Sequence, residues 1–460
     1  MGTAGIERHG DESADTGGGG SALRLAALVG TSSEWYDFFL YATAAAVVFP
    51  VTFFPATLDP FVALLASLST FAVGFVARPL GAVFFGHLGD RAGRKTAFAT
   101  ALVTMGLATT LIGLLPPYTR IGTLAPLALV LLRLVQGFAV GGQWGGALLL
   151  ATESAPGSKR GLSAGIAQAG VPFGVVLANL AFLLSSGVTS PATFMAYGWR
   201  VPFVASVVLV GLAALIQFRL QDTAAFRGLR DRPERGVSPV LTALRRYPRS
   251  ILVAAGANIS GMLAFYILIT YVVAYGVGAG GLRMPRNLML GAVLIANVAM
   301  IPAELVAGRL SDTYGRRRII VIGQMLLAAW SFALFPLMQT RSFLCITVAI
   351  TVGQGLVALI HAPVSALMAE LFSVQVRYSA ASLAYQISSV VGGGVAPIVA
   401  TALYARYHGN TFISIYMAIA CAVSLLCVAV VGRVHKTDLG RGLAPAVAGA
   451  QSLGAGNMPP

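Results

Sequence analysis

The chain has 460 residues, of which 57% are hydrophobic and 10% are charged. An ordinary soluble domain carries about 25% charged residues, so the composition excludes a soluble globular protein and indicates a multi-pass membrane protein. The formal net charge of +15 would point to nucleic acid in a soluble protein. Here the basic residues gather at the ends of apolar runs, so no nucleic-acid partner is expected.

Twelve segments contain the roughly 20 mostly apolar residues that a membrane span needs. They are 24–50, 61–85, 96–116, 124–151, 161–187, 200–220, 250–277, 288–310, 319–338, 342–371, 380–405 and 411–433. Residues 1–22 and 434–460 flank them as polar, Gly-rich tails, for which we predict disorder. The start of the chain has more acid than base, the reverse of a signal peptide.

The first predicted span, TSSEWYDFFLYATAAAVVF, carries two acids at membrane depth. Glu34 and Asp37 are spaced i, i+3 and Tyr41 follows four residues on, so the three share one helical face. A charge at the membrane centre costs at least about 2.5–3.5 kcal/mol, which disfavours a purely structural use. We predict that at least one of the acids couples a proton or binds substrate. The alternative is that they only neutralise arginines and fix helix packing.

The fourth predicted span contains an arginine, Arg133, in the run RLVQGFAVGG. A guanidinium at this depth can pair with a span-one acid or bind a substrate carboxylate through two parallel hydrogen bonds. The structural alternative is a permanent salt bridge between spans one and four. Gly137, Gly141 and Gly145 form a ridge of small residues, which predicts that this span approaches a neighbour closely.

The polar segment 221–249 divides the spans into two sets of six. It holds seven arginines against three acids and indicates a cytoplasmic linker. The loops on its side are richer in basic residues than the opposite loops, so both termini are expected in the cytoplasm.

Two motifs of the first half return in the second. GHLGDRAGRK at 86–95 is echoed by GRLSDTYGRR at 308–317, and Glu153 with Arg160 is echoed by Glu370 with Arg377. Matched echoes in corresponding loops indicate a duplication. We therefore predict an all-α membrane protein with twelve transmembrane helices in two pseudo-symmetric six-helix bundles, 23–220 and 250–433.

These motifs resemble the major facilitator superfamily, through its loop signature at 86–95 and its fourth-helix pattern in RLVQGFAVGG. Longer blocks resemble its metabolite:proton symporters, whose members import shikimate, α-ketoglutarate, citrate, or proline and betaine. These blocks are GTSSEWYDFFLYATAAAVVFP, GGQWGGALLLATESAP, YGWRVPF and AELFSVQVRYSAASLAYQISSVVGGGVAPIVATAL. The first two look closest to the shikimate-like branch. The resemblance covers nearly the whole chain apart from the tails and implies the major facilitator fold.

Two cavity positions depart from the family pattern. Gln143 stands where the family usually has Glu, and His361 begins a His-Ala-Pro-Val run where Y-G-P-Q is usual. The substrate or the proton route is therefore expected to differ from the best-known relatives. His361 is a candidate proton site, because histidine is the side chain that ordinarily changes charge near neutral pH, although a packed core histidine is the alternative. Glu304 is an equally open candidate.

The resemblance implies a latch between the two halves at the cytoplasmic surface, held by charge pairs and helix ends. Its residues are Gly86, Asp90, Arg91, Gly93, Arg94, Lys95, Glu153, Arg160, Asp312, Arg316, Glu370 and Arg377. The alternative is that basic loops here only set topology. The candidate substrate cavity is lined by Tyr41, Arg133, Gln143, Gln168, Asn258, Tyr385 and Gln386. Each of these polar residues alternatively makes an interhelical hydrogen bond.

The leading hypothesis is a proton-coupled symporter that imports a small organic acid by alternating access, because a cationic pore residue suits an anion. The runner-up is a proton-driven efflux antiporter for a drug or secondary metabolite, since AGVPFG at 169–174 is similar to an antiporter pattern. A receptor on the same fold is a third class. We expect no enzyme activity, no cofactor and no metal. We expect a monomer in the cytoplasmic membrane, with a small-molecule substrate, protons and lipid as its partners.

Overall fold

The structure is a computed structural model that describes residues 32, 35–92, 94–141, 159–219, 239–278, 280–372 and 377–431. Its first half begins with helix 35–47. The following elements are α2 (Phe49–Thr52), α3 (Pro60–Ala92), α4 (Arg94–Leu114), α5 (Tyr118–Ile121), α6 (Leu124–Gly141), α8 (Arg160–Gly187), α9 (Pro191–Thr193), the π-helix η2 (Phe194–Gly198) and α10 (Arg200–Arg219).

The second half follows the same plan, with two of its long helices interrupted by π-helical turns. Its elements are α12 (Pro239–Arg246), α13 (Pro248–Tyr266), η3 (Ile267–Tyr271), α14 (Val272–Val277), α15 (Arg286–Tyr314), α16 (Arg316–Gln339), α17 (Phe343–Leu371), α18 (Arg377–Ser388), η4 (Ser389–Gly394), α19 (Ala396–Tyr407) and the helix Thr411–Val431.

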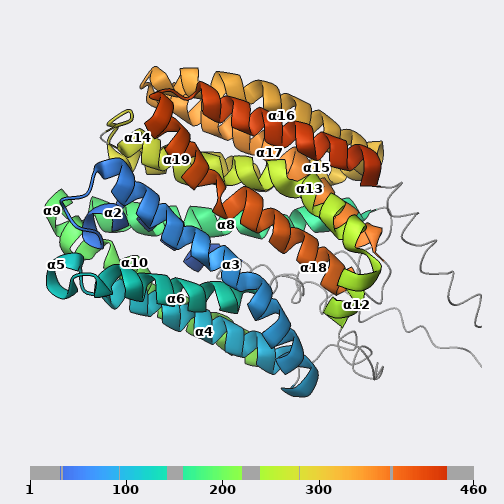
Figure 1. Cartoon of the computed structure of the whole chain (residues 1–460), viewed down its shortest axis with the longest axis horizontal. Coiled ribbons are helices and arrows are strands. Elements are labelled where there is room, and N and C mark those ends of the chain that lie inside the picture. The colour runs from blue at the N-terminus through green and yellow to red at the C-terminus, as the bar shows by residue number, and fades with distance from the viewer. Residues whose placement is uncertain are drawn as a thin grey trace, which may run out of the picture.

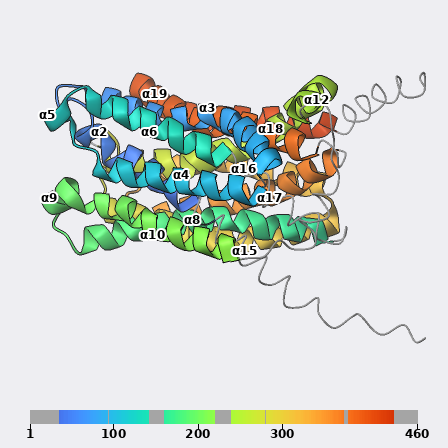
Figure 2. The same cartoon turned by 90° about the horizontal axis from the view of Figure 1, so that it is seen from below.

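Every one of the twelve predicted spans contains helix in the described part of the chain. Nine helices there are long and apolar enough to cross a membrane. Helical structure is the expected result for such sequences, because hydrocarbon offers no partner for backbone groups and a helix satisfies them internally. The long helices run side by side, with α5 and α9 at one end of the molecule and α12 at the other (Figures 1 and 2).

Two helix pairs form the symmetric contacts between the halves, and α8 also contacts α17. The α8 helix packs along α15, and α3 packs against α18, η4 and α19. Span five packs against span eight, and span two packs against span eleven. The second pair is the equivalent of the first, because span two of the first half corresponds to span eight and span eleven of the second half corresponds to span five. This arrangement agrees with the predicted duplication.

Glycines set the closeness of these contacts. A Cβ atom on Gly161 would overlap the backbone of Gly308, so α8 and α15 touch backbone to backbone. Within the first half, a Cβ atom on Gly137 would overlap the backbone of Gly74 on α3, and one on Gly141 would overlap the backbone of Arg78. The predicted small-residue ridge of span four is confirmed at these two positions. Gly145 lies outside the described residues.

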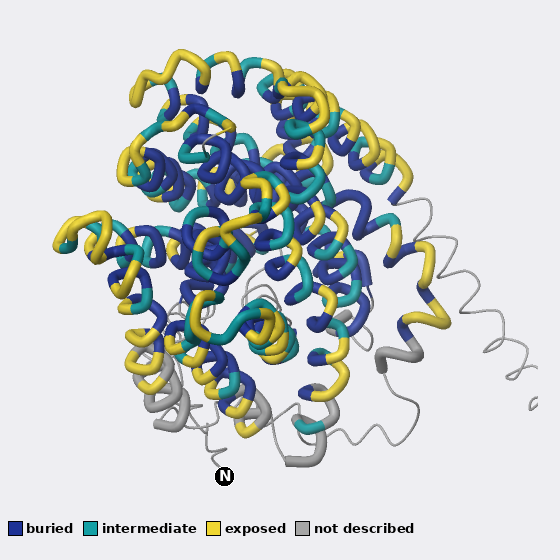
Figure 3. Tube along the Cα trace, turned by 60° about the vertical axis from the view of Figure 1, so that its left-hand side comes forward, coloured by how far each residue is buried: buried dark blue, intermediate teal, exposed yellow. Residues whose placement is uncertain are grey.

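Burial increases toward the middle of the molecule, and exposed residues occupy the outward helix faces (Figure 3). The most enclosed span is Pro248–Val277, in which 83% of the apolar window is buried. This α13–η3–α14 helix therefore lies in the interior, where it can contact residues of both halves.

The loop signatures differ from the prediction, because they are mostly helical. Residues 86–92 extend α3, and Arg94 and Lys95 begin α4. In the second copy α15 continues to Tyr314 and α16 begins at Arg316, so only Gly315 separates them. Its φ of 91° is accessible to glycine at little cost. The predicted linker 221–249 also contains helix, namely α12, and α13 already begins at Pro248.

Candidate functional site

Arg133 on α6 lies in an aromatic enclosure near the centre of the molecule. Its side chain is fully buried, and the guanidinium carbon lies 4.2 Å from the ring centre of Tyr41, 4.5 Å from that of Phe38 and 4.8 Å from that of Phe71. Such cation–π contacts contribute about 2 kcal/mol or more when they are desolvated. The rings hold the guanidinium in place without neutralising its charge.

The N–H groups of Arg133 are only partly used. Nη1 donates to Gln136 Oε1, and Nε donates to the backbone oxygen of Phe71 at 3.4 Å. Nη2 is buried and has no hydrogen-bond partner. Gln136 is itself fixed, since its Nε2 donates to Thr109 Oγ1 at 2.8 Å. One edge of the guanidinium is thus held by protein and the other retains donors for an acceptor.

Asp37 is buried in the same half but does not pair with Arg133. Its carboxylate faces the hydroxyl groups of Thr109 and Ser206, on α4 and α10. Those hydroxyls donate to the backbone oxygens of Met105 and Pro202, so both carboxylate oxygens of Asp37 lack a partner. The proposed ion pair between Arg133 and a span-one acid is therefore wrong for Asp37. The other acid, Glu34, lies outside the described residues.

Arg78 on α3 is a second buried arginine, which our interpretation of the sequence missed. Only 1% of its surface is exposed, and its guanidinium carbon lies 4.4 Å from the ring centres of both Phe38 and Phe75. Its Nε and Nη2 atoms lack hydrogen-bond partners. Its position inside the predicted span 61–85 was a sufficient signal, because an ionisable residue within a membrane span is a functional candidate by default.

The second half closes this enclosure through Tyr266 of α13. Its ring centre lies 5.4 Å from that of Phe75 and 5.9 Å from that of Phe71. We call the set of Arg78, Arg133, Phe38, Tyr41, Phe71, Phe75 and Tyr266 the arginine–aromatic cluster. Because both halves contribute to it, a movement of one half against the other changes the surroundings of both guanidinium groups.

The other predicted cavity residues are not members of this cluster. Asn258 donates from Nδ2 to Ser388 Oγ at 2.9 Å, which ties α13 to α18 and favours the interhelical alternative. Gln168 on α8 and Tyr385 on α18 are buried. Gln386 is buried and its Oε1 has no partner. Gln143 lies outside the described residues.

His361 lies beside Glu304 in the second half. His361 Nδ1 is 3.6 Å from Glu304 Oε1, and the exposed fractions of the two side chains are 3% and 0%. Glu304 belongs to α15 and His361 to α17. The structure thus joins two candidates that the sequence had left separate.

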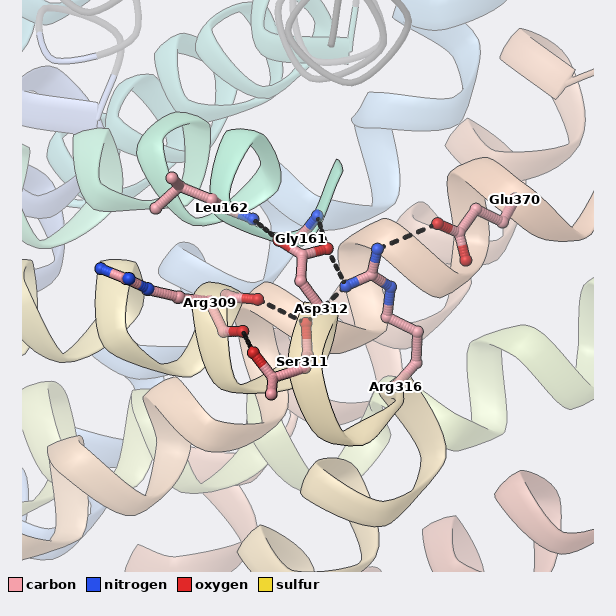
Figure 4. Close-up of polar contacts among 9 residues, drawn as sticks. Gly161, Leu162, Arg309, Ser311, Asp312, Arg316 and Glu370 are labelled. Carbon is pink, nitrogen blue, oxygen red and sulfur yellow. Dashed lines mark hydrogen bonds and ion pairs between the residues drawn. The ribbon is translucent and has the colours of Figure 1, made fainter. Parts of the chain in front are cut away.

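One end of the α8–α15 contact, the end at the start of α8, is held by Asp312 (Figure 4). Its two carboxylate oxygens accept hydrogen bonds from the backbone N–H groups of Gly161 and Leu162, both at 2.9 Å. These groups open α8, so a carboxylate of one half caps a helix of the other. Arg316 Nη1 lies 2.6 Å from Asp312 Oδ1, and its Nη2 lies 3.1 Å from Glu370 Oε1.

The structure describes most, but not all, of the remaining predicted latch residues. Arg160 is the first residue of α8, and Arg377 is the first of α18. Glu370 contacts Arg316, which our motif-based reading did not anticipate. Gly86, Asp90 and Arg91 lie on α3, and Arg94 and Lys95 on α4. Gly93 and Glu153 lie outside the described residues.

Comparison with known protein families and solved structures identifies the superfamily of the chain. The family model described as "Sugar (and other) transporter" matches residues 23–245, and that described as "Major Facilitator Superfamily" matches residues 287–447. The chain is similar to the xylose transporter XylE from E. coli in a partially occluded inward-open conformation, with a TM-score of 0.70. The sequence identity is 16%, and the match covers 90% of this chain and 97% of that one.

The fold and the family models define a transporter, not an enzyme, and the chain belongs to the major facilitator superfamily. Within that superfamily its relatives are metabolite transporters. It is 40% identical over 405 residues to the inner membrane metabolite transport protein YhjE of Escherichia coli (strain K12), covering 87% of this chain and 92% of that protein. It is 36% identical over 411 residues to the shikimate transporter of the same organism, with the same coverage.

Proposed function

We propose that this transporter imports a small organic acid together with protons, by rocking its two halves around the arginine–aromatic cluster. The observation that carries the proposal is the pair Arg78 and Arg133, two buried cations that both have N–H groups without an acceptor in the described part of the chain. A carboxylate can accept two parallel hydrogen bonds from a guanidinium and neutralise its charge. The relative named as a shikimate transporter supports this substrate class.

The charge of the enclosure also separates the classes of solute. A cationic drug would meet two like charges, which cost several kcal/mol at close range. We therefore favour an organic anion over a cationic drug.

Proton coupling is the second part of the proposal, and Asp37 supports it. A buried carboxylate without hydrogen-bond partners is stabilised when it takes up a proton. One proton crossing a potential of 100 mV supplies about 2.3 kcal/mol, which is enough for roughly fifty-fold accumulation of solute. His361 is a further proton candidate, and Glu34 and Gln143 stay predictions from the sequence.

We further propose that the protein acts as a monomer in the cytoplasmic membrane, with both termini in the cytoplasm. The latch residues Asp312, Arg316 and Glu370 would then lie at the cytoplasmic surface, in keeping with the basic residues on that side.

The test is uptake into proteoliposomes that contain the full chain. Labelled shikimate, α-ketoglutarate, citrate and proline are each supplied with an inward proton gradient and without one. We expect accumulation of at least one of the three acids only with the gradient. If none accumulates under either condition, the proposal is refuted.

The same vesicles distinguish the antiporter, which the sequence left as an alternative. An antiporter would release protons from the vesicle interior when its solute enters from outside. A pH-sensitive dye trapped in the lumen reports this directly, because symport acidifies the lumen and antiport makes it more alkaline.

A further inference from the structure

The buried pair Glu304–His361 stands apart from the other charge contacts in the described part of the chain. The two other ion pairs there join Arg316 to Asp312 and to Glu370, at the cytoplasmic end. Glu304 and His361 instead lie well inside helices of 29 residues each. Their exposed fractions of 0% and 3% remove them from solvent almost completely.

The geometry of the Glu304–His361 pair differs from that of an ion pair that only fixes two helices together. A carboxylate that fixes helices is satisfied on both oxygens, as Asp312 is by two amide N–H groups and Arg316. In contrast, both oxygens of Glu304 and both ring nitrogens of His361 have no hydrogen-bond partner among the described residues. The 3.6 Å separation of Nδ1 and Oε1 is longer than a normal hydrogen bond. Glu304 and His361 are therefore close enough to interact electrostatically, but no hydrogen bond fixes them in place.

Among the described residues, His361 is the only charged side chain that acts on Glu304, and the backbone of Ala362 also lies near its carboxylate. On its other side, His361 packs against Gly261 and lies near Phe265, with ring centres 5.5 Å apart and the rings tilted. The nearest face of α8 presents Gly165, which has no side chain to titrate. The protonation state of the pair is therefore decided by its two members and by their access to water.

The pair also touches the contact between the two halves. The α8 helix of the first half approaches so closely that a Cβ atom on Gly165 would collide with the backbone oxygen of Glu304. On the opposite side Phe265 connects the pair to the arginine–aromatic cluster, because its ring centre lies 5.5 Å from that of Tyr266. A charge change at the pair thus acts where the halves meet and one ring away from the cluster.

We infer that Glu304 and His361 together form a proton-binding site in the second half, whose occupancy sets the balance between the inward-facing and outward-facing states. With one proton the pair is neutral, either as acid plus imidazole or as carboxylate plus imidazolium. Without that proton it carries a net charge of −1, which is costly in a dry interior and favoured where water enters. The inference deepens the proposed proton coupling and rests on it.

The proton-binding step is a simple transfer that balances in charge. A proton enters the pair from the aqueous side to which it is open, and the halves rock while the pair is neutral. The same proton leaves to water on the opposite side. If the pair binds its proton more tightly in one of the two states, inward-facing or outward-facing, then a change of pH shifts the populations of these states. This holds even when no solute is present.

The experiment measures that shift directly in the full chain without solute. Spin labels at Thr96→Cys on α4 and Arg318→Cys on α16, two exposed positions on different halves, report the separation of the cytoplasmic ends. The native cysteines Cys345, Cys421 and Cys427 are replaced by serine or alanine. Pulsed electron resonance on protein in nanodiscs then compares about pH 5.5 with about pH 8, the range in which histidine titrates.

We expect the ratio of the two distance populations to change with pH in the wild-type background. One coupled proton moves this ratio by at most about tenfold per pH unit. Glu304→Gln and His361→Gln should each weaken or abolish the response. Gln354→Leu is the matched control, because it removes a buried, unpartnered amide from the same helix as His361 without removing a titrating group.

Thermal melting of each purified variant checks that it is folded. If Glu304→Gln does not fold, the comparison of wild type with His361→Gln is used alone. The inference is overturned if the wild-type distances do not respond to pH, or if both variants keep the full response. Because no organic acid is used, this outcome is independent of whether the proposed substrate class is correct.

Discussion

At the scale of single residues, the groups that a buried charged side chain faces decide which ligand or proton it can bind. Arg133 and Asp37 both lie in the interior of the first half, yet Arg133 points into rings of helix 35–47 and α3, while Asp37 faces α4 and α10. Under the proposed function, Arg133 is therefore the side chain that a solute in the arginine–aromatic cluster would meet. Asp37 would take up its proton on the side that faces α4 and α10.

Substituting Arg133 by lysine tests the role of the guanidinium. Lysine keeps the charge but loses the fork of parallel N–H groups. Charge-assisted hydrogen bonds contribute about 1.5–3 kcal/mol, so we expect the apparent affinity for the transported acid to fall about tenfold or more. The concentration dependence of initial uptake measures it. Arg200→Lys is the control, because Arg200 lies outside the cluster, where it binds the carbonyl groups of Gly113 and Leu115 and lies over the ring of Trp199. An unchanged affinity would show that Arg133 is purely structural.

Replacing Asp37 by asparagine tests the proton role of the first half. The amide cannot take up a proton, so accumulation driven by a proton gradient should be lost while exchange of solute across the membrane continues. Counterflow and gradient-driven uptake in the same vesicles measure the two activities. Glu34→Gln is the companion variant. Full accumulation in both would exclude the span-one acids as the proton site.

At the scale of elements, the second copy of the loop signature, at 308–317, acts through helix ends. The α15 helix carries Asp312 past the end of the predicted span, and the start of α8 offers two free N–H groups to its carboxylate. The sequence marked these residues through their repeated motif. It did not show that the partner of Asp312 is a helix of the other half, because backbone amides leave no pattern in a sequence.

Changing Asp312 to asparagine should weaken the contact between the start of α8 and the end of α15. The amide loses the charge that attracts Arg316 and the start of α8, which removes about 1.5–3 kcal/mol for a charge-assisted hydrogen bond. We expect the spin-label pair at positions 96 and 318 to show a larger share of the longer distance. Thr313→Ala is the control, since its hydroxyl only bonds the backbone of Arg309 on the same helix. Equal distances in the two variants would argue against a latch.

At the scale of the whole molecule, the two halves are connected by the paired contacts α8–α15 and α3–α18/η4/α19. The first contact is bonded at both ends. Ser186 Oγ donates to Asn287 Oδ1 at 2.8 Å at the end opposite the Asp312 contact. Rocking of the halves must separate one of these ends at a time.

Cross-linking that opposite end should stop transport. In a background without native cysteines, Ser186→Cys and Asn287→Cys are joined by mild oxidation or by a short thiol-reactive linker. We expect uptake to fall to the level of empty vesicles and to return after reduction, because the outward-facing state cannot form. The single-cysteine variants serve as controls. Normal uptake by the cross-linked protein would contradict separation of the halves at this point.

The sequence by itself determined the membrane class, the twelve spans and the duplication, because span length, apolar composition and repeated motifs are local properties that lipid enforces. It also singled out Arg133, Asp37, His361 and Glu304, since charged and titratable residues are rare and costly within spans. Only the tertiary structure decided their partners. Contacts such as Glu304 with His361, or Arg78 and Arg133 around Phe38, join residues far apart in the chain, and they depend on helix rotation and glycine-limited packing that no single segment encodes.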